Sequence, residues 1–336
     1  MPSWGEVLEE LQSAAPGPGV LDFDGVRRKY LRQLHERTGR STVLYATDWL
    51  SGNASQSASL TLQDMQGLME VFHNLPGPNL DLILHSPGGQ AEAADRLVRY
   101  MRSKFTHVRV FIPLAAMSAA TMWAMAADEI VMGKHSQLGP IDPQVMLPSG
   151  IAMPVGALLE QFEEASQQLA AQPDKIAAWL PTLQQYPPGL LNFCQAAAKL
   201  AEQLVAEWVE TYMLAGDADP QTKAMQIAAW LADDKTHLSH SRAITRDQLR
   251  DHGVVVRDLE EDQELQDAVL SVHHATMHTF NGPAVKLIEN NLGRAFVVQG
   301  GQQVMLIPQS LPRQGPVVPQ PPVPAPIPAP PADWSP

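Results

Sequence analysis

Between residues 41 and 133, short apolar segments alternate with longer amphipathic ones, and this alternation restricts the fold more than any other feature. Strands joined by helices of about a dozen residues form parallel βαβ units, because a parallel crossover needs a connection of that length. The segments LDLIL and VRVFIP are almost wholly apolar, which is typical of a sheet that is covered on both faces. The expected strands are Thr42–Ala46, Leu80–His85, Val108–Pro113 and Glu129–Gly133, and the expected helices between them are 62–75, 91–104 and 118–127.

The rest of the chain divides into three parts around this repeat. Residues 1–40 are expected to form a helical lead-in, with a break at 16–19 and a polar helix over 26–40. Twelve of the 29 prolines lie in residues 308–336, so we expect a disordered, extended tail from residue 296 onward. The domain over 41–295 should end in a helical extension, with helices at 155–171, 190–214, 225–232 and 264–280, a strand at 254–256 and a short helix at 284–291.

The net charge and the cysteine content restrict the binding partners and the cellular compartment that can be expected. The net charge is −13, so nucleic acid and anionic membranes are poor partners. The single cysteine, Cys194, is expected to pack in the core and cannot form an internal disulfide, which fits a reducing compartment. The N-terminus carries no export signal, and the uncharged stretch 110–127 is short for a membrane span. We therefore expect a cytoplasmic protein that does not cross a membrane.

Two short motifs follow neighbouring strands of the predicted sheet. HSPGG, over residues 85–89, pairs Gly88 with Gly89 where the backbone can turn its N–H groups toward a ligand. AMSAAT, over residues 116–121, places Ser118 among small side chains that leave room for a substrate carbonyl. Taken alone, the two are more typical of an ordinary turn and of a helix cap. Their shared position at the carboxyl ends of adjacent parallel strands favours a functional site.

The chain resembles the serine dehydrogenase proteinase family, relatives of ClpP and of signal peptide peptidase A. HSPGG, AMSAATMWAMAADEIVMG and HSQLGPIDPQ carry the resemblance, and a weaker likeness continues from SHSRAIT to KLIENNLGRAF. The resemblance implies a ClpP-like, crotonase-type fold, a serine peptidase activity through an acyl-enzyme, and Ser118 as the nucleophile. It also implies an oxyanion hole formed by the backbone of Gly88, Gly89 and Ala119, and a homo-oligomeric assembly.

The same resemblance suggests a Ser–His–Asp triad, with Asp142 of LGPIDPQ as the acid and His240 of SHSRAIT as the base. ClpP places its histidine where this chain reads Ile141-Asp142-Pro143, so the base comes from elsewhere. A base must take the serine proton near neutral pH, which suits histidine. His237 and Lys199 are the alternatives, and Asp128 is a competing acid.

Other motifs point to ordinary roles. His273, His274 and His278 are spaced for one helix face, but without HExxH or a nearby cysteine they are expected to form an ordinary polar face rather than a metal site. The absence of phosphate-binding or dinucleotide motifs predicts no cofactor. Two alternatives to a peptidase stay open: a crotonase-like acyl-CoA enzyme, and a non-catalytic scaffold that binds protein partners through the Pro-rich tail.

Overall fold

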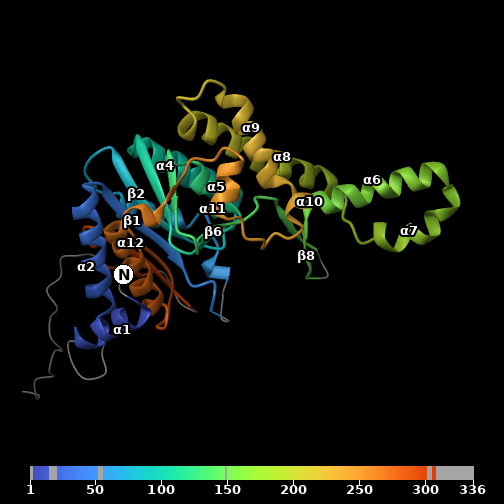
Figure 1. Ribbon diagram of the computed structural model, residues 1–336. Coiled ribbons are helices and arrows are strands. Elements are labelled where there is room, and N and C mark those ends of the chain that lie inside the picture. Colours follow the sequence, from blue (N-terminus) through green and yellow to red (C-terminus); the bar gives the residue numbers. More distant parts are fainter. Residues whose placement is uncertain (1–2, 15–20, 52–55, 148–149, 301–304, 308–336) are drawn as a thin grey trace, which may run out of the picture.

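A twisted, mostly parallel sheet lies at the centre of the protein (Figure 1). The structure is a computed structural model that describes residues 3–14, 21–51, 56–147, 150–300 and 305–307. Within these residues the sheet has eight strands in the order β12-β11-β10-β1-β2-β3-β5-β9. The parallel strands are β1 (Ser41–Thr47), β2 (Asn79–His85), β3 (His107–Ile112), β5 (Glu129–Met132) and β9 (Val256–Asp258). The predicted α/β class with a parallel sheet is therefore confirmed.

The crossover helices of the repeat cover one face of the sheet. They are α3 (Asp64–Val71), α4 (Ala91–Lys104) and α5 (Ala119–Met125). The same apolar core takes in helices from later in the chain: α8 (Leu190–Trp208), its π-helical continuation Val209–Met213, α9 (Pro220–Ala232) and α11 (Arg246–Asp251). The short α10 (Asp234–His237) and the two-stranded pairing of β4 (Ala115–Ala116) with β6 (Gln137–Leu138) lie beside it.

Three helices cover the opposite face. They are α1 (Trp4–Ser13), α2 (Phe23–Thr38) and α12 (Gln263–Thr279), and they pack with a separate apolar core. Side chains along the strands alternate between the two cores: Leu82 and Leu84 of β2 belong to the first, whereas Ile83 belongs to the second. Because successive side chains of a strand point to opposite faces, the apolar run Leu82, Ile83 and Leu84 means that β2 is buried on both sides.

The predicted helix at 284–291 is wrong, because these residues form β10 (Ala284–Asn290), antiparallel to β1. Two buried charged residues, Lys286 and Glu289, interrupt the apolar pattern that would indicate a strand. Lys286 pairs with Asp64 at 2.6 Å, and Glu289 pairs with Arg27 at 2.5 Å. Buried charges need such partners, and these partners lie more than 200 residues away in the sequence.

The sheet also continues beyond residue 295, where we expected the tail to begin. β11 (Ala295–Gln299) pairs antiparallel with β10, and β12 (Met305–Ile307) pairs with β11. The boundary at 296 is corrected accordingly. The predicted break at 16–19 and the prolines of 308–336 lie outside the described residues.

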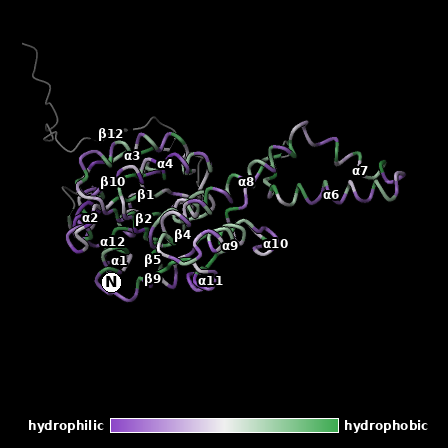
Figure 2. The backbone as a smooth tube through the Cα atoms, turned by 90° about the horizontal axis from the view of Figure 1, so that it is seen from above, coloured by the Kyte–Doolittle hydropathy of each residue, from purple (hydrophilic) through white to green (hydrophobic). Residues whose placement is uncertain are grey.

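A helical arm projects away from the sheet, as both views show (Figures 1 and 2). It comprises the hairpin of β7 (Gln144–Met146) and β8 (Ala152–Pro154), α6 (Val155–Ala171) and α7 (Ile176–Leu183). A small apolar cluster of Val155, Leu158, Leu190 and Cys194 joins the base of the arm to α8. No residue of α7 is buried, and Ile176 and Leu180 are each 46% exposed.

Candidate active site

The turn after β2 requires both of its glycines. Gly88 has φ of 88° and Gly89 has φ of 156°. A Cβ atom on Gly88 would lie 2.3 Å from the Met117 carbonyl oxygen, and one on Gly89 would lie 2.2 Å from the Leu60 carbonyl oxygen. Neither contact is tolerated by a side chain, so the close packing of this turn depends on glycine.

The turn that carries Ser118 lies against the glycine turn. Ser86 and Ala116 form a parallel bridge, in which the Ser86 N–H donates to the Ala115 carbonyl at 3.2 Å and the Met117 N–H donates to the Ser86 carbonyl at 2.9 Å. Two segments separated by 30 residues are thereby fixed side by side. The space that a Gly88 side chain would fill lies 2.8 Å from the Ser118 Cβ.

Ser118 itself has a strained backbone. Its φ is 52° and its ψ is −123°, a combination that costs a residue with a side chain on the order of 1–3 kcal/mol. Such strain persists only where surrounding contacts impose it, and it is typical of serine nucleophiles held at a strand-to-helix turn. The side chain of Ser118 makes no capping bond to α5. A simple capping role therefore does not explain this serine.

Backbone N–H groups surround the same point. The Ala119 nitrogen would lie 2.8 Å from a Cβ on Gly88, so the first turn of α5 and the glycine turn are in contact. The Gly88 N–H donates to the Ser86 hydroxyl at 3.2 Å. Within the described part of the chain, the N–H groups of Gly89 and Ala119 bind no acceptor. These two donors remain available to a bound carbonyl oxygen.

His240 and Asp142 form a hydrogen-bonded pair. His240 Nδ1 lies 2.8 Å from Asp142 Oδ1, and the other carboxylate oxygen accepts from Gln144 Nε2 at 2.7 Å. An antiparallel bridge between Leu138 and Ile244 brings together the two loops that carry the pair. Asp142 is buried and the His240 side chain is 26% exposed.

The charge of Asp142 is felt by a neighbouring carboxyl group. Burial raises the pKa of Asp234, and the negative charge of Asp142 raises it further. A buried carboxylate next to another carboxyl group depends on partners that donate hydrogen bonds to it. Here those partners are the His240 ring and the Gln144 amide.

Ser118, Ala119, the two glycines and His240 line one pocket of about 420 Å³. Asp142 lies behind His240 and does not line it. In the described residues no hydrogen bond joins Ser118 to His240, although both face the same pocket. Catalytic hydrogen bonds are often long without substrate. The apolar part of the wall is formed by Met122, Ile141, Phe193, Leu200 and the small residues Ala91, Ala197 and Ala201.

The alternative site residues lie elsewhere. Lys199 is exposed on α8 and does not line the pocket. His237 is buried, its Nε2 donates to the Trp230 carbonyl at 2.8 Å, and it does not line the pocket either. Asp128 accepts from Arg102 and from the Val108 N–H. Cys194 is fully buried, and burial raises the pKa of its thiol, as the predicted core role requires.

Two residues of the site escaped sequence reasoning. Gln144 follows Asp142 by two positions and holds its second oxygen, but a glutamine after Pro143 carries no local signal of that role. Phe193 is 57% exposed and lines the pocket. It belongs to a helix that the sequence places 75 residues after Ser118, so only the fold brings the two together.

Part of the chain is similar to a known protein family. Residues 59–179 match the model of a family described as ClpP-like SDH-type serine proteinase. The match contains Ser118, both glycines and Asp142, but not His240. The predicted family resemblance is confirmed over these residues.

Two uncharacterised proteins of Methanocaldococcus jannaschii are similar in sequence. One is 36% identical over 87 residues, which cover 26% of this chain and 30% of the relative. The other is 27% identical over 198 residues, which cover 59% of each chain. The chain thus spans less than two thirds of the length of either relative.

A solved structure, a point mutant of the 1510-N membrane-bound stomatin-specific protease, matches with a TM-score of 0.34 and 14% identity, over 60% of this chain and 77% of that one. So low a score adds nothing to the fold derived above. Among the described residues, no helix combines the length and the apolar character needed to cross a membrane.

Proposed function

We propose that this protein is a serine peptidase with Ser118 as its nucleophile. The observation that carries the proposal is the strained Ser118 turn, which faces a pocket shared with a histidine that is hydrogen-bonded to a buried aspartate. The match of residues 59–179 to a family of serine proteinases supports it. Neither a plain helix cap nor an ordinary surface histidine needs this combination.

The proposed reaction follows from the positions of these groups. His240 takes the proton of the Ser118 hydroxyl through Nε2, while Asp142 holds Nδ1 and keeps the ring in the required tautomer. The Ser118 oxygen attacks the peptide carbonyl, and the N–H groups of Gly89 and Ala119 bind the oxyanion. His240 then gives its proton to the leaving amine as the C–N bond breaks. In the second half of the reaction, water attacks the acyl-enzyme while His240 takes a proton from it, and His240 returns this proton to the Ser118 oxygen as the acyl group leaves.

The pocket wall suggests the kind of side chain that is accepted near the cleaved bond. Met122, Ile141 and Leu200 present apolar surface, and Phe193 adds an exposed aromatic ring at the rim. A charged substrate side chain against these apolar groups would lose its hydration, and Glu92, the carboxylate among the described lining residues, is exposed to solvent. We propose peptides with an apolar residue at this position as substrates.

Labelling with a fluorophosphonate probe, together with hydrolysis of a peptide library, tests the proposal. Ser118→Ala should abolish labelling and lower turnover by roughly 10⁴-fold or more, with the melting temperature maintained. His240→Ala should cost nearly as much. Lys199→Ala is the matched control, because Lys199 is exposed outside the pocket, and it should retain activity.

Three results would count against this assignment. Undiminished labelling of the Ser118→Ala protein would place the nucleophile elsewhere. An active His240→Ala enzyme with an inactive Lys199→Ala enzyme would replace the triad by a Ser–Lys dyad. A folded wild-type protein that neither labels nor hydrolyses peptides would favour the scaffold or the acyl-CoA alternative.

A further inference from the structure

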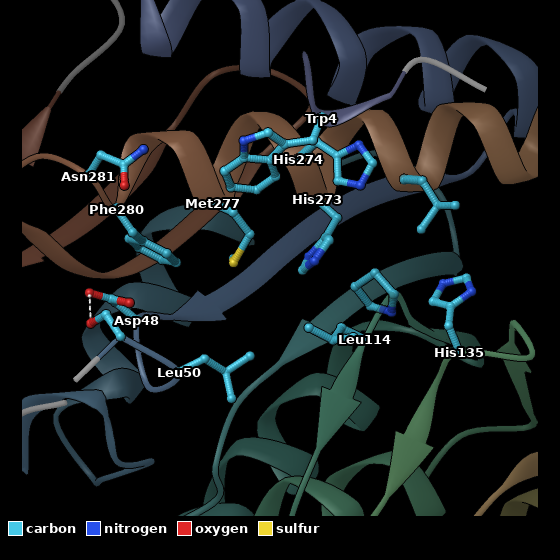
Figure 3. A pocket seen from close by; sticks show the side chains of 13 residues that line it. Trp4, Asp48, Leu50, Leu114, His135, His273, His274, Met277, Phe280 and Asn281 are labelled. Atoms are coloured by element: carbon cyan, nitrogen blue, oxygen red, sulfur yellow. Dashed lines mark hydrogen bonds between the residues drawn. The ribbon is translucent and has the colours of Figure 1, made fainter. Parts of the chain in front are cut away.

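A second cavity, of about 590 Å³, lies on the other face of the sheet. It opens where β1, β3 and β5 end and is bounded by α12 and by Trp4 of α1 (Figure 3). In open α/β sheets, ligands bind in crevices at the carboxyl ends of the strands. The catalytic pocket and this cavity use the same end of the sheet on opposite faces, and they share no lining residue.

The sequence-based expectation of an ordinary polar face on α12 is wrong. His273 and His278 are 7% and 2% exposed. The Trp4 ring lies over His278, with ring centroids 3.9 Å apart, and His278 Nε2 donates to the Trp4 carbonyl at 3.0 Å. α1 therefore covers this face, and the two histidines next to each other, His273 and His274, line the cavity.

Uncharged imidazoles form the polar part of this region. His273 packs against His85 of β2, with the two rings edge to face and their centroids 5.2 Å apart. Burial lowers the pKa of His85 to about 4. Burial also lowers the pKa of His273 well below its ordinary value, and the neighbouring His85, His274 and His135 lower it further. Both rings are neutral at physiological pH.

Two of these imidazoles have unused hydrogen-bonding capacity. The His85 Nδ1 atom lies 3.1 Å from the Ala115 carbonyl oxygen, which can only accept, so Nδ1 carries the proton and Nε2 is an acceptor. Within the described residues, His85 Nε2 is buried without a partner, and neither ring nitrogen of His273 makes a hydrogen bond. His273 lines the cavity, and its neutral ring has one nitrogen that can donate and one that can accept a hydrogen bond.

The side chains around the cavity argue against an anion and against a metal ion. None of the described residues that line it is Lys or Arg, and Asp48, which accepts from the Ser51 hydroxyl at 2.7 Å, contributes a negative charge. An anion would therefore be unpaired and repelled. Across the described residues, no group of three His, Cys, Asp or Glu side chains is placed to hold a metal ion. Most of the wall is apolar: Trp4, Leu50, Leu114, Leu270, Met277 and Phe280.

We propose that this cavity binds an uncharged, mainly apolar organic molecule whose hydroxyl group forms one hydrogen bond with a ring nitrogen of His273. The volume is in the range of small-molecule sites, which combine apolar walls with a few placed polar groups. This proposal is independent of the peptidase assignment, because it uses none of the residues of the catalytic pocket.

Calorimetric titration with three probes of one shape tests the proposal on the full-length protein. 2-Naphthol carries the hydroxyl group, naphthalene lacks it and 2-naphthoate is an anion. We expect 2-naphthol to bind about tenfold more tightly than naphthalene, as one net hydrogen bond allows, and 2-naphthoate to bind most weakly. His273→Phe keeps an aromatic ring but removes both nitrogens, so 2-naphthol affinity should fall about tenfold to that of naphthalene.

Two further variants locate the binding. Met277→Trp, at a half-buried wall position, fills the cavity and should abolish binding of both neutral probes. His252→Phe makes the same type of change at an exposed histidine outside the cavity and should bind like the wild type. The proposal is overturned if 2-naphthol does not bind, if naphthalene binds equally well, or if 2-naphthoate binds most tightly. It is also overturned if His273→Phe or Met277→Trp leaves the affinity for 2-naphthol unchanged.

Discussion

Acid should destabilise this protein through His85, and the structure sets the size of the effect. His85 is 1% exposed, and burial lowers its pKa to about 4, although the bond to Ala115 works slightly in the other direction. In the unfolded chain the imidazole returns to its ordinary pKa of about 6.5. Between these two values the unfolded state binds a proton that the folded state does not, so stability is lost as the pH falls through this window.

The magnitude follows from the two pKa values. Between about pH 7.5 and about pH 5, this one group should lower the free energy of unfolding by about 2 kcal/mol. Above about pH 6.5 its contribution is fully present, and below about pH 4 the loss is complete. His273 acts in the same direction, because its pKa is also lowered by burial.

Urea unfolding followed by circular dichroism at both pH values measures the effect. His85→Asn keeps an N–H donor for the Ala115 carbonyl and does not titrate in this range, so its loss of stability on acidification should be smaller by about 2 kcal/mol. Titration of the carboxyl groups is common to both proteins and cancels. His252→Asn, at an exposed position, should follow the wild type. Equal losses for the wild type and His85→Asn would refute the reasoning.

Three further outcomes are expected. Asp142→Asn should reduce kcat by roughly 10²–10⁴-fold with labelling of Ser118 slowed rather than lost, because the His240 ring loses its orienting carboxylate; an unchanged kcat would remove Asp142 from the site. Gly88→Ala should abolish activity while the protein still folds, since the added Cβ would lie 2.3 Å from the Met117 carbonyl oxygen; an active variant would show that the turn tolerates displacement. We also expect light scattering to show a homo-oligomer. The double variant Ile176→Glu/Leu180→Glu places charges on the exposed apolar residues of α7 and should dissociate it; a monomeric wild type would contradict this.

The periodic part of the fold could be read from the sequence. α4 has the predicted bounds at both ends, and β1, β2 and β3 differ by a residue or so, because both their faces are apolar and their periods are unambiguous. β10 was predicted as a helix because Lys286 and Glu289 interrupt its apolar pattern, and their distant partners Asp64 and Arg27 are invisible to a local window.

The residues of the candidate site differ in how far the sequence could predict them. Ser118 and the two glycines lie in short motifs that each fit an ordinary turn or helix cap, and their shared position at the ends of adjacent strands, together with the family resemblance, pointed to them. The pairing of His240 with Asp142 spans 98 residues, and it was suggested by family resemblance rather than by any local pattern. The histidines of α12 were expected on a polar face because a helical pattern does not show that α1 covers them.

The alternation along β2 has a consequence for insertions and deletions in this chain. Leu82 and Leu84 face the core shared with α5, whereas Ile83 and His85 face α12. Loss of one residue from this strand would exchange the two sets, turning an imidazole toward the Ser118 side and leucines toward the histidine cavity. Loss of two residues would leave each remaining side chain on its own face of the sheet and would only draw the glycine turn back along the strand. Strand length is thus constrained by parity, because a change of two residues keeps each side chain on its face and a change of one residue does not.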